Sequence, residues 1–218
     1  MAKRLLIWGA SGHAQVVADI VNLNGAYDLV GFFDDITPLR SGQTLYGLPI
    51  FNRPEQLDEL LRDGVGELIV GIGDCQARLM LAEVSREKGF HLPTAVHPGA
   101  IVAADAKIGA GSVVVAGAVV NPGARIGENV IINTCASVDH ECDLEDGVHV
   151  SPGAHLAGRV VVGRAAWIGI GAVVADRVHI GAGAMIGAGA VVINDIPDHV
   201  VAYGVPAKVI RKRMSNES

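Results

Sequence analysis

His140 and Glu141 are the neighbouring residues best suited to proton-transfer chemistry in this sequence. Histidine serves as a general base because its pKa lies near working pH. A neighbouring carboxylate orients the imidazole and stabilises its protonated form. Adjacent side chains at a turn need not point in opposite directions, so contact between the two groups is possible. The pair therefore predicts a base that removes a proton from a substrate.

Three other histidines of the same region occupy a different position. His149, His155 and His179 each come directly before an aliphatic residue of a six-residue repeat, whereas His140 comes two residues after one. A position that accepts three histidines tolerates them structurally, so His155 and His179 are interpreted as structural. We expect no metal site, because one repeat step should turn His149 and His155 to different faces.

The repeat runs from Val102 to Val192 and must position these histidines. Every sixth residue in this stretch is Val, Ile or Leu, and Gly, Asn or Asp dominates three residues later. A period of six fits neither a helix nor a simple alternating strand, but it fits a short strand and a tight turn that recur. Val96 falls in the same register, whereas Asp198 breaks it, so the repeat is expected to end at residues 195–199.

The repeat resembles the left-handed β-helix of the hexapeptide-repeat acyltransferases over roughly residues 96–212. In that family three hexapeptides form one triangular coil of about 18 residues, the aliphatic residues fill the prism, and the protein is a trimer. The resemblance implies a homotrimer with sites between neighbouring prisms. A Gly/Ala/Val-rich β-sandwich is the alternative fold.

Strands and helices are expected to alternate in the first 95 residues. The apolar patterns fall at residues 4–8, 14–22, 29–33, 54–63, 67–72 and 76–88. This βαβαβ order indicates a small parallel, Rossmann-like sheet. The predicted fold is therefore α/β plus all-β, with a small Rossmann-like βαβαβ domain over 1–95 and a left-handed parallel β-helix over 96–218.

Candidate ligand-binding residues follow all three predicted strands. Ligands of such sheets bind beyond the carboxyl ends of the strands. The helix N-terminus after the first strand offers backbone N–H groups to a phosphate. A structural β–α turn and a solvated loop are the alternatives, because the first turn lacks the full dinucleotide-binding spacing. The candidates are Gly9–His13, the pair Asp34 and Asp35, and the pair Gly73 and Asp74.

The strand–GASGH–helix opening, the Asp-Asp pair and the β-helix together resemble the sugar O/N-acyltransferases of the sialic-acid and bacillosamine-pathway type. The resemblance implies an acetyl-CoA-dependent N-acetyltransferase that acts on a nucleotide-linked 4-amino-4,6-dideoxy sugar in bacterial glycan biosynthesis. It makes 1–95 the nucleotide-sugar-binding domain and 96–218 the acetyl-CoA-binding catalytic domain with a C-terminal cap. The expected contacts with the nucleotide sugar are Ser11, Gly12, His13, Asp34, Asp35 and Gly73. Residues 133–142 match the family segment Asn-Thr-x-x-x-Val-x-His-Glu/Asp-Cys. That match implies His140 as the general base and Glu141 as the residue that raises its basicity.

The resemblance also implies an acetyl-CoA site on the prism. It places His149 near the thioester carbonyl, although a histidine stacked between coils is the structural alternative. Glycine-rich coil edges would hold the pantetheine arm, with Ile170 and Ala188 as contacts; the family often has Gly in place of Ala188. The tail resembles a Gly-x-Pro-Ala-Lys cap, in which Lys208 would attract a CoA phosphate, unless it lies in a solvated tail.

Composition and charge exclude other classes. The chain has 218 residues, half of them hydrophobic, and a net charge of −6, which suits a soluble protein that does not bind nucleic acid. The first apolar run is too short for a signal peptide, and none is long enough for a membrane span. Three cysteines without CxxC spacing favour a cytoplasmic location. Cys142 falls at a small-residue position of the repeat, where packing explains it.

Two other functions stay open from the sequence. An O-acetyltransferase that acts on a free sugar acid, such as sialic acid, would share the prism and differ in the nucleophile. A non-catalytic trimeric scaffold of a polysaccharide pathway would not need the intact pair His140 and Glu141.

Overall fold

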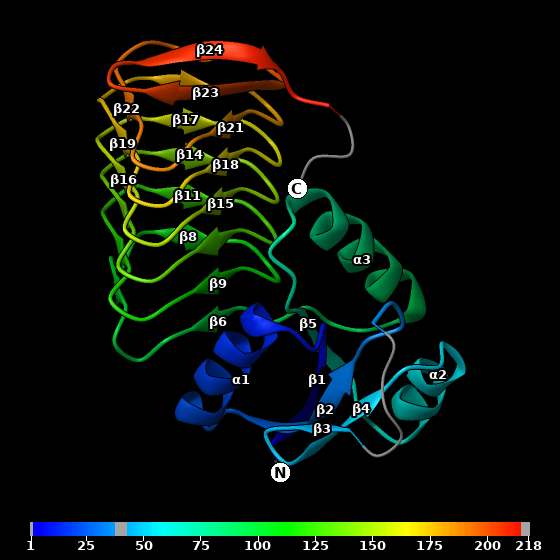
Figure 1. The fold of residues 1–218 in the computed structure, drawn as a ribbon. Coiled ribbons are helices and arrows are strands. Elements are labelled where there is room, and N and C mark those ends of the chain that lie inside the picture. Colours follow the sequence, from blue (N-terminus) through cyan, green and yellow to red (C-terminus); the bar gives the residue numbers. More distant parts are fainter. Residues whose placement is uncertain (1, 38–42, 215–218) are drawn as a thin grey trace.

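The computed structural model describes residues 2–37 and 43–214, which form a small α/β unit and a long β-helical prism (Figure 1). The last four residues of the predicted second domain, 215–218, lie outside this description. The prism begins at β6 (Ala95–Val96), which pairs with β9 (Val113–Val114). The predicted boundary after residue 95 therefore falls within the first strand of the prism.

The N-terminal unit is a five-stranded sheet with the order β3-β4-β2-β1-β5. Apolar side chains of α1 fill one face of this sheet, and those of α2 and α3 fill the other. The elements are β1 (Lys3–Trp8), α1 (Gly12–Asn24), β2 (Tyr27–Phe33), β3 (Thr44–Leu45), β4 (Leu48–Phe51), α2 (Glu55–Arg62), β5 (Glu67–Val70) and α3 (Cys75–Lys88). All three expected strands and all three expected helices are present.

The sequence-based prediction of three strands was incomplete, because it missed the hairpin of β3 and β4. Tyr46 and Gly47 form its two-residue turn, and both have positive φ, 54° and 73°. That backbone matches the tight turns preferred by hairpins. β4 then runs parallel to β2, with Phe32 opposite Ile50. The hairpin thus extends the sheet beyond β2.

Two-residue strands stack into the three faces of the prism. The six-stranded face consists of β7 (Ile101–Val102), β10 (Val119–Val120), β13 (Ser137–Val138), β16 (His155–Leu156), β19 (Val173–Val174) and β22 (Val191–Val192). The five-stranded face consists of β8 (Lys107–Ile108), β11 (Arg125–Ile126), β14 (Asp143–Leu144), β17 (Val161–Val162) and β20 (His179–Ile180). The eight-stranded face consists of β6, β9, β12 (Ile131–Ile132), β15 (His149–Val150), β18 (Trp167–Ile168), β21 (Met185–Ile186), β23 (Val200–Gly204) and β24 (Ala207–Lys212).

The predicted register is confirmed. Val119 pairs with Ser137, 18 residues further on, so three hexapeptides complete one coil. The aliphatic residues of the repeat fill the prism, and Cys142 packs among them. Left-handed backbone occurs at the expected turn glycines, but also at Glu141, with a φ of 57°. The same turn position is left-handed at Asn129, Cys135, Arg159, Ala165 and Arg177, so the turn of the coil requires this backbone and Glu141 is not exceptional.

The six-residue spacing ends at residues 195–199, as expected, but the pairing between coils continues beyond it. Ile196 still pairs with Ile180, and Val201 still pairs with Met185, in each case 16 residues away. The chain therefore completes one more coil that is two residues shorter. The antiparallel strands β23 and β24 then close this end of the prism (Figure 1).

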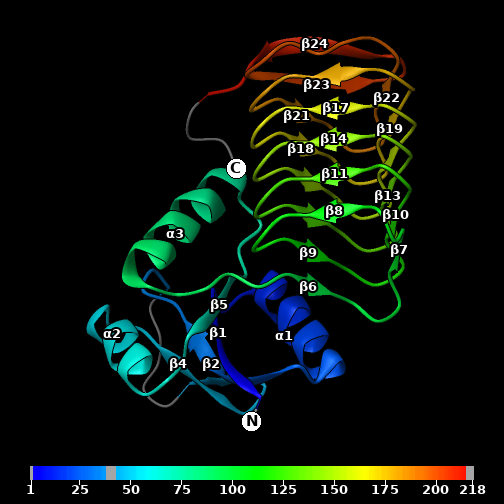
Figure 2. The same ribbon diagram turned by 180° about the vertical axis from the view of Figure 1, so that it is seen from behind.

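The three faces differ in what covers them. The N-terminal unit packs on the eight-stranded face, where Val113 and Val115 join the core beneath α1. The six-stranded face lies on the side away from α3 in both ribbon views (Figures 1 and 2). No element within residues 2–37 and 43–214 covers it, and it exposes apolar side chains, including Ile101 (67% exposed) and Val173 (44% exposed). No helix within the described ranges is both long and apolar enough to cross a membrane.

Two edges of the prism carry the candidate residues. The slot corner, residues 151–154 with 169–172 and 187–190, lies where the eight-stranded face turns into the six-stranded face. The histidine corner, residues 139–142 with the coil positions on either side, lies where the six-stranded face turns into the five-stranded face. The six-stranded face therefore separates the two corners.

Candidate active site

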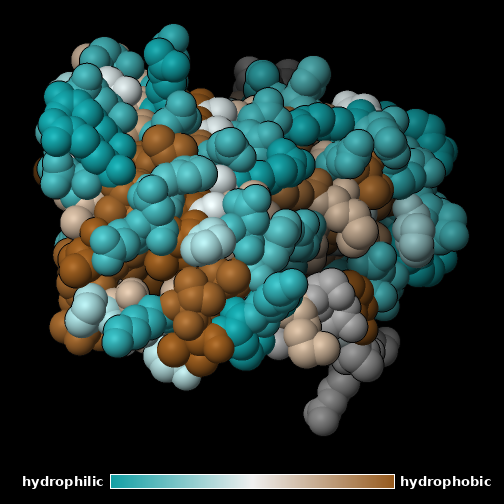
Figure 3. Space-filling view, turned by 90° about the horizontal axis from the view of Figure 1, so that it is seen from above, coloured by the Kyte–Doolittle hydropathy of each residue, from teal (hydrophilic) through white to brown (hydrophobic). Residues whose placement is uncertain are grey.

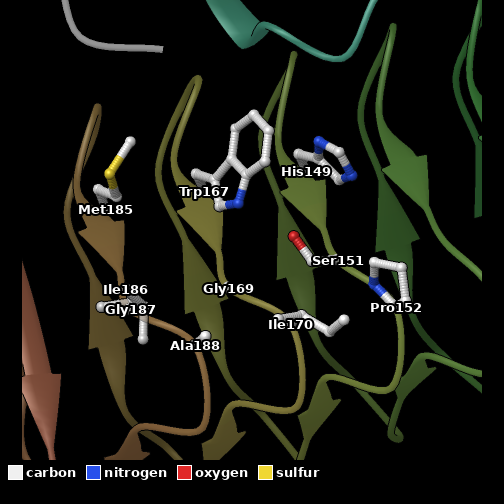
Figure 4. A pocket seen from close by; sticks show the side chains of 10 residues that line it. All are labelled: His149, Ser151, Pro152, Trp167, Gly169, Ile170, Met185, Ile186, Gly187 and Ala188. Atoms are coloured by element: carbon white, nitrogen blue, oxygen red, sulfur yellow. The ribbon is translucent and has the colours of Figure 1, made fainter. Parts of the chain in front are cut away.

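A groove of about 430 Å³ runs along the slot corner across successive coils (Figure 4). His149, Trp167 and Met185 project into it from three neighbouring strands, and Ile170 and Ala188 lie at the turns. Its size and largely apolar lining suit a slender ligand with few polar groups. The fold thus brings together His149, Ile170 and Ala188, three of the four residues expected to bind the cofactor.

Lys208, the fourth of these residues, lies in the closing hairpin, beyond the last coil that lines the groove. Tyr203 occupies the place one coil beyond Gly187, because Ala202 pairs with Ile186. Lys208 lies opposite Tyr203 in the closing hairpin. Its exposed ammonium therefore stands beyond the groove, where it would meet the far end of a long ligand.

The tautomer of His149 is fixed by its neighbours. Oδ1 of Asn133 accepts a hydrogen bond from the backbone N–H of Thr134 at 2.8 Å, so the amide nitrogen faces Nε2 of His149 at 3.1 Å. An amide N–H can only donate, so Nε2 is the acceptor and the ring proton lies on Nδ1. Nδ1 lies 3.3 Å from the carbonyl oxygen of Gly73. Protein atoms therefore engage both ring nitrogens.

Burial keeps His149 neutral. Its removal from solvent is the main reason that its pKa falls to about 3, and the positive charge of Arg78 and the ring of His13 lower the pKa further. The ring packs against Trp167 with the two centroids 4.3 Å apart. An imidazole held in this way is a weak proton acceptor. Its position suits a wall of the groove better than a base.

The carboxyl ends of β1, β2 and β5 meet at one edge of the N-terminal sheet, as predicted. The N–H of Gly9 donates to the carbonyl of Phe33, and the N–H of Gly71 donates to the carbonyl of Trp8, each at 2.7 Å. The loop that contains Gly73 continues from this edge to α3. The candidate residues after all three strands therefore border one region.

The N-terminus of α1 faces this edge with Ser11, Gly12 and His13. Ser11 precedes the helix without a side-chain capping bond, and open space surrounds Gly12. Backbone N–H groups at such a terminus attract anions. His13 lies beside His149, with ring centroids 6.5 Å apart. Its Nε2 atom is buried and has no partner among the described residues, and burial lowers its pKa to about 4, with a further contribution from Arg78.

The two aspartates after β2 differ in their surroundings. Asp34 accepts hydrogen bonds from the backbone N–H groups of Ile36 and Thr37, at 3.1 and 2.9 Å. It therefore shapes its own loop. Asp35 is exposed and is the carboxylate of the pair that faces solvent.

His140 lies on the histidine corner in a charged network. Its Nδ1 is 3.1 Å from Oε2 of Glu141, and the same oxygen is 2.8 Å from Nη2 of Arg159. The pKa of Glu141 is lowered, first by its hydrogen bond with His140 and then by the charge of Arg159. Behind the ring, Asp139 accepts a hydrogen bond from Asn121 at 2.9 Å. The carboxylate of Glu141 is thus ionised and holds Nδ1 of His140. This leaves Nε2 of His140 as the nitrogen that can accept a proton.

Gly158 provides the space in which the ring of His140 lies. A Cβ atom at Gly158 would come within 2.5 Å of Nε2 of His140. The φ angle of Gly158 is not positive, so its lack of a side chain matters here for space and not for backbone conformation. Gly158 and Arg159 come one coil after His140 and Glu141, so each coil supports the imidazole and carboxylate that the previous coil carries.

The structure does not bring His140 and the groove together within one chain. His140 belongs to the histidine corner, whereas the groove that His149 lines runs along the slot corner, at the opposite edge of the six-stranded face. His149 and His155 also lie on different faces, as expected from the repeat. Within the described ranges, no group of three or more potential metal ligands is present.

Sequence analysis missed Arg78, Trp167, Gly158 and Arg159. Gly158 and Arg159 could have been found, because each lies 18 residues, the predicted coil length, after a predicted catalytic residue. Arg78 carried a weaker signal. It shares the buried side of α3 with residues three, four and seven positions later, a place usually taken by apolar residues. Trp167 carried no comparable signal.

Two family models match this chain: the PglD N-terminal domain over residues 4–84 and the bacterial transferase hexapeptide repeats over residues 159–194. A perosamine N-acetyltransferase of Caulobacter crescentus is 39% identical to this chain. It was solved with CoA and GDP-perosamine as a variant in which asparagine replaces one histidine. The alignment covers 94% of this chain and 96% of that one, with a TM-score of 0.90. The chain belongs to the hexapeptide-repeat N-acetyltransferases of nucleotide-linked amino sugars. The predicted Rossmann-like unit and left-handed β-helix are thereby confirmed.

Other members of the family agree with this assignment. The acetyltransferase domain of PglB from Neisseria gonorrhoeae FA1090, solved with acetyl coenzyme A, is 38% identical. That alignment covers 96% of this chain and all of that one, with a TM-score of 0.89. The UDP-N-acetylbacillosamine N-acetyltransferase of Bacillus subtilis (strain 168) is 38% identical over 116 residues, which span 52% of each protein.

Proposed function

We propose that this protein transfers the acetyl group of acetyl-CoA to the amino group of a nucleotide-linked 4-amino-4,6-dideoxy sugar. The family relationship supports the reaction class, since the relatives act on, or were solved with, nucleotide sugars and CoA. The groove of the slot corner supports the donor. The carboxyl edge of the N-terminal sheet, with an uncapped helix N-terminus, supports a phosphate-bearing acceptor.

The observation that carries the proposal is the uncovered apolar face between the two corners. Hydrophobic side chains gather on the prism side of the molecule in Figure 3. The outward residues of the six-stranded face are Ile101, Val119, Ser137, His155, Val173 and Val191. A surface of this kind usually marks a contact with another chain. Three copies that pack these faces around an axis would bring the histidine corner of one copy to the slot corner of the next.

His140 is the general base in this proposal. The neutral amine of the sugar attacks the thioester carbon, which forms the C–N bond, and the amine proton passes to Nε2 of His140. Glu141 stabilises the resulting imidazolium. The C–S bond then breaks, and the CoA thiolate takes the proton back from the imidazolium. Arg159 keeps the base in place through its ion pair with the Glu141 carboxylate. Gly158 does so because its lack of a side chain leaves space for the ring.

The groove would hold the donor. Its apolar lining fits the pantetheine arm along Ile170 and Ala188, with His149 and Trp167 beside the thioester end. Lys208 would meet a phosphate at the opposite end of CoA. The acceptor would lie with its diphosphate at Ser11 and Gly12, next to His13 and Gly73.

The test is acetyl-CoA turnover, followed by thiol release, with UDP-, GDP- and dTDP-linked 4-amino sugars and with free sialic acid. The proposal predicts turnover with at least one nucleotide-linked amino sugar and a product 42 Da heavier, about the mass of an acetyl group in place of hydrogen, that resists hydroxylamine as an amide does. Turnover with sialic acid alone and an ester product would replace it with O-acetylation. If the protein does not bind acetyl-CoA in calorimetry, the non-catalytic trimeric scaffold becomes the favoured function.

A further inference from the structure

Arg78 of α3 is a fully buried guanidinium. Among the described residues, no carboxylate pairs with it. Its three nitrogens instead donate to backbone carbonyl groups at 2.7 to 3.4 Å, three in the loop after β5 and three on the prism. The acceptors are Ile72, Gly73 and Asp74 in the loop, and Asn129, Gly147 and Val148 on the prism.

The two halves of the guanidinium face different units of the protein. The backbone oxygens that Nη1 contacts lie in the loop after β5, with that of Gly73 at 2.7 Å. The backbone oxygens that Nε and Nη2 contact lie on the prism, with that of Asn129 at 2.7 Å and that of Gly147 at 2.8 Å. A rigid planar fork holds such groups at a fixed separation, which the flexible ammonium of lysine cannot do. Arg78 thus sets the position of the loop on the prism.

The carbonyl of Gly73 connects this fork to the groove. It accepts from Arg78 and also faces Nδ1 of His149 at 3.3 Å. The same loop borders the expected acceptor site, whereas His149 lines the expected donor groove. One backbone oxygen therefore joins the two binding regions of a chain.

We propose that Arg78 is a positioning residue for the transfer reaction. It fixes the loop of Gly73 against the prism and, through the shared carbonyl, holds His149 in its neutral form with the proton on Nδ1. The acceptor loop and the wall of the acetyl groove then keep a constant separation. This inference rests on the proposed function for its kinetic part only.

The first test is the conservative variant Arg78→Lys. It keeps the charge but removes the fork, so the loop can shift while the groove, built from the prism alone, stays intact. We expect kcat/KM for the nucleotide sugar to fall about 10–100-fold, because small displacements of a reacting group cost that much. KM for acetyl-CoA should stay within about threefold of wild type. A merely structural role would instead lower kcat in proportion to the folded fraction and leave both KM values unchanged.

Arg86 offers a matched control on the same helix. It also joins α3 to the prism, through an exposed ion pair with Glu128. Arg86→Lys and Arg86→Gln should leave both KM values and kcat near wild type, since exposed pairs contribute little. An equal loss in Arg78→Lys and Arg86→Gln would overturn the proposal, as would wild-type kinetics in Arg78→Lys.

A second measurement needs no variant and no substrate. In ¹⁵N-histidine NMR of the wild-type protein, His149 should show a protonated Nδ1 and an unprotonated Nε2 from pH 8 down to about 4. The opposite tautomer, or protonation near pH 6.5, would overturn the proposal even if Arg78→Lys does not fold. If the wild-type protein has no transferase activity but His149 shows the expected tautomer, the proposed function fails and the positioning of His149 stands.

Discussion

His140 and His149 come from successive parts of one repeat, yet they lie in opposite environments. His140 stands at a turn, 47% exposed in its side chain, and shares a carboxylate with Arg159. His149 stands on a strand beneath the N-terminal unit, 5% exposed, with both ring nitrogens engaged by protein. The repeat is the same for both; the position within it differs.

The comparison shows how a uniform coil produces distinct chemistry. A strand residue that points outward takes the environment of whatever covers its face, so His149 becomes neutral and fixed. A turn residue projects from an edge, so His140 keeps one nitrogen for a substrate. In the proposed reaction, proton transfer therefore falls to the exposed histidine, and the buried one shapes the groove.

Removal of the exposed histidine should have the largest effect on activity. His140→Ala is expected to lower kcat by about 10²–10⁴, the usual range for loss of a general base, and to leave the melting temperature nearly unchanged. Steady-state kinetics and thermal unfolding measure both. His179→Ala, which removes an exposed histidine from the five-stranded face, is the control and should keep full activity. Near-normal turnover of His140→Ala would contradict the assignment of the base.

Displacement of the same ring should cost less. Gly158→Ala places a methyl group against Nε2 of His140, and the end of a side chain can move aside more easily than backbone. We expect kcat to fall about 10–100-fold with little loss of stability. Asp176→Ala, at the same corner position one coil further on, should have little effect. Wild-type kcat in Gly158→Ala would mean that the observed ring position is not the working one.

The buried histidines should affect how the stability of the folded protein depends on pH, and not its activity. The pKa values of His149 and His13, about 3 and about 4, lie below the value of about 6.5 expected when the chain is unfolded. The unfolded chain therefore binds more protons as the pH falls from 6.5 towards 4, and the folded state loses stability in that range. From pH 7 to 5 the loss should be about 1–2 kcal/mol per histidine.

Denaturant unfolding at several pH values tests this slope. His149→Phe should remove about half of the pH dependence, whereas His179→Ala should keep all of it. The same slope in wild type and in His149→Phe would show that His149 is protonated normally in the folded protein.

The smallest effect is expected at the far end of the groove. Lys208→Gln removes one exposed positive charge and should raise KM for CoA about 3–10-fold at low salt, with kcat unchanged. The difference should shrink at high salt because exposed charges are screened. Lys107→Gln, on the five-stranded face, is the control. No change in KM at low salt would remove Lys208 from the CoA site.

Sequence analysis predicted the regular features of the fold and missed the irregular ones. The six-residue register predicted the prism, and its phase distinguished His140 from the other histidines, because each step fixes the direction of a side chain. The register could not predict the shortened coil around Ile196, in which pairing continues after the spacing changes. It also gave no signal for the hairpin at Tyr46 and Gly47, whose strands are short.

The candidate site was predictable where one residue type indicates one chemistry. His140 with Glu141 is such a case: the structure shows the predicted contact between the two side chains, and the role of His140 as the base stays a prediction. Arg78 is not, because an arginine within a helix usually lies at the surface, and only the contact between α3 and the prism buries it. Its acceptors are backbone carbonyl groups, which exist at every residue and leave no trace in side-chain composition.

The central claim is that the base and the groove of one active site come from different copies of the chain. Mixed trimers test it. His140→Ala lacks the base, and Ala188→Trp blocks the groove, so each variant alone should be inactive. Co-expressed with different tags and purified through both, they should recover activity, with about a third of the sites intact, because every trimer that holds both variants has one site with an intact base and an intact groove.

Activity near that level in the mixed trimers, and none in His140→Ala trimers that carry both tags, is the predicted result. Mixed trimers as inactive as either parent would place His140 and the groove of one site in the same chain, which contradicts the account.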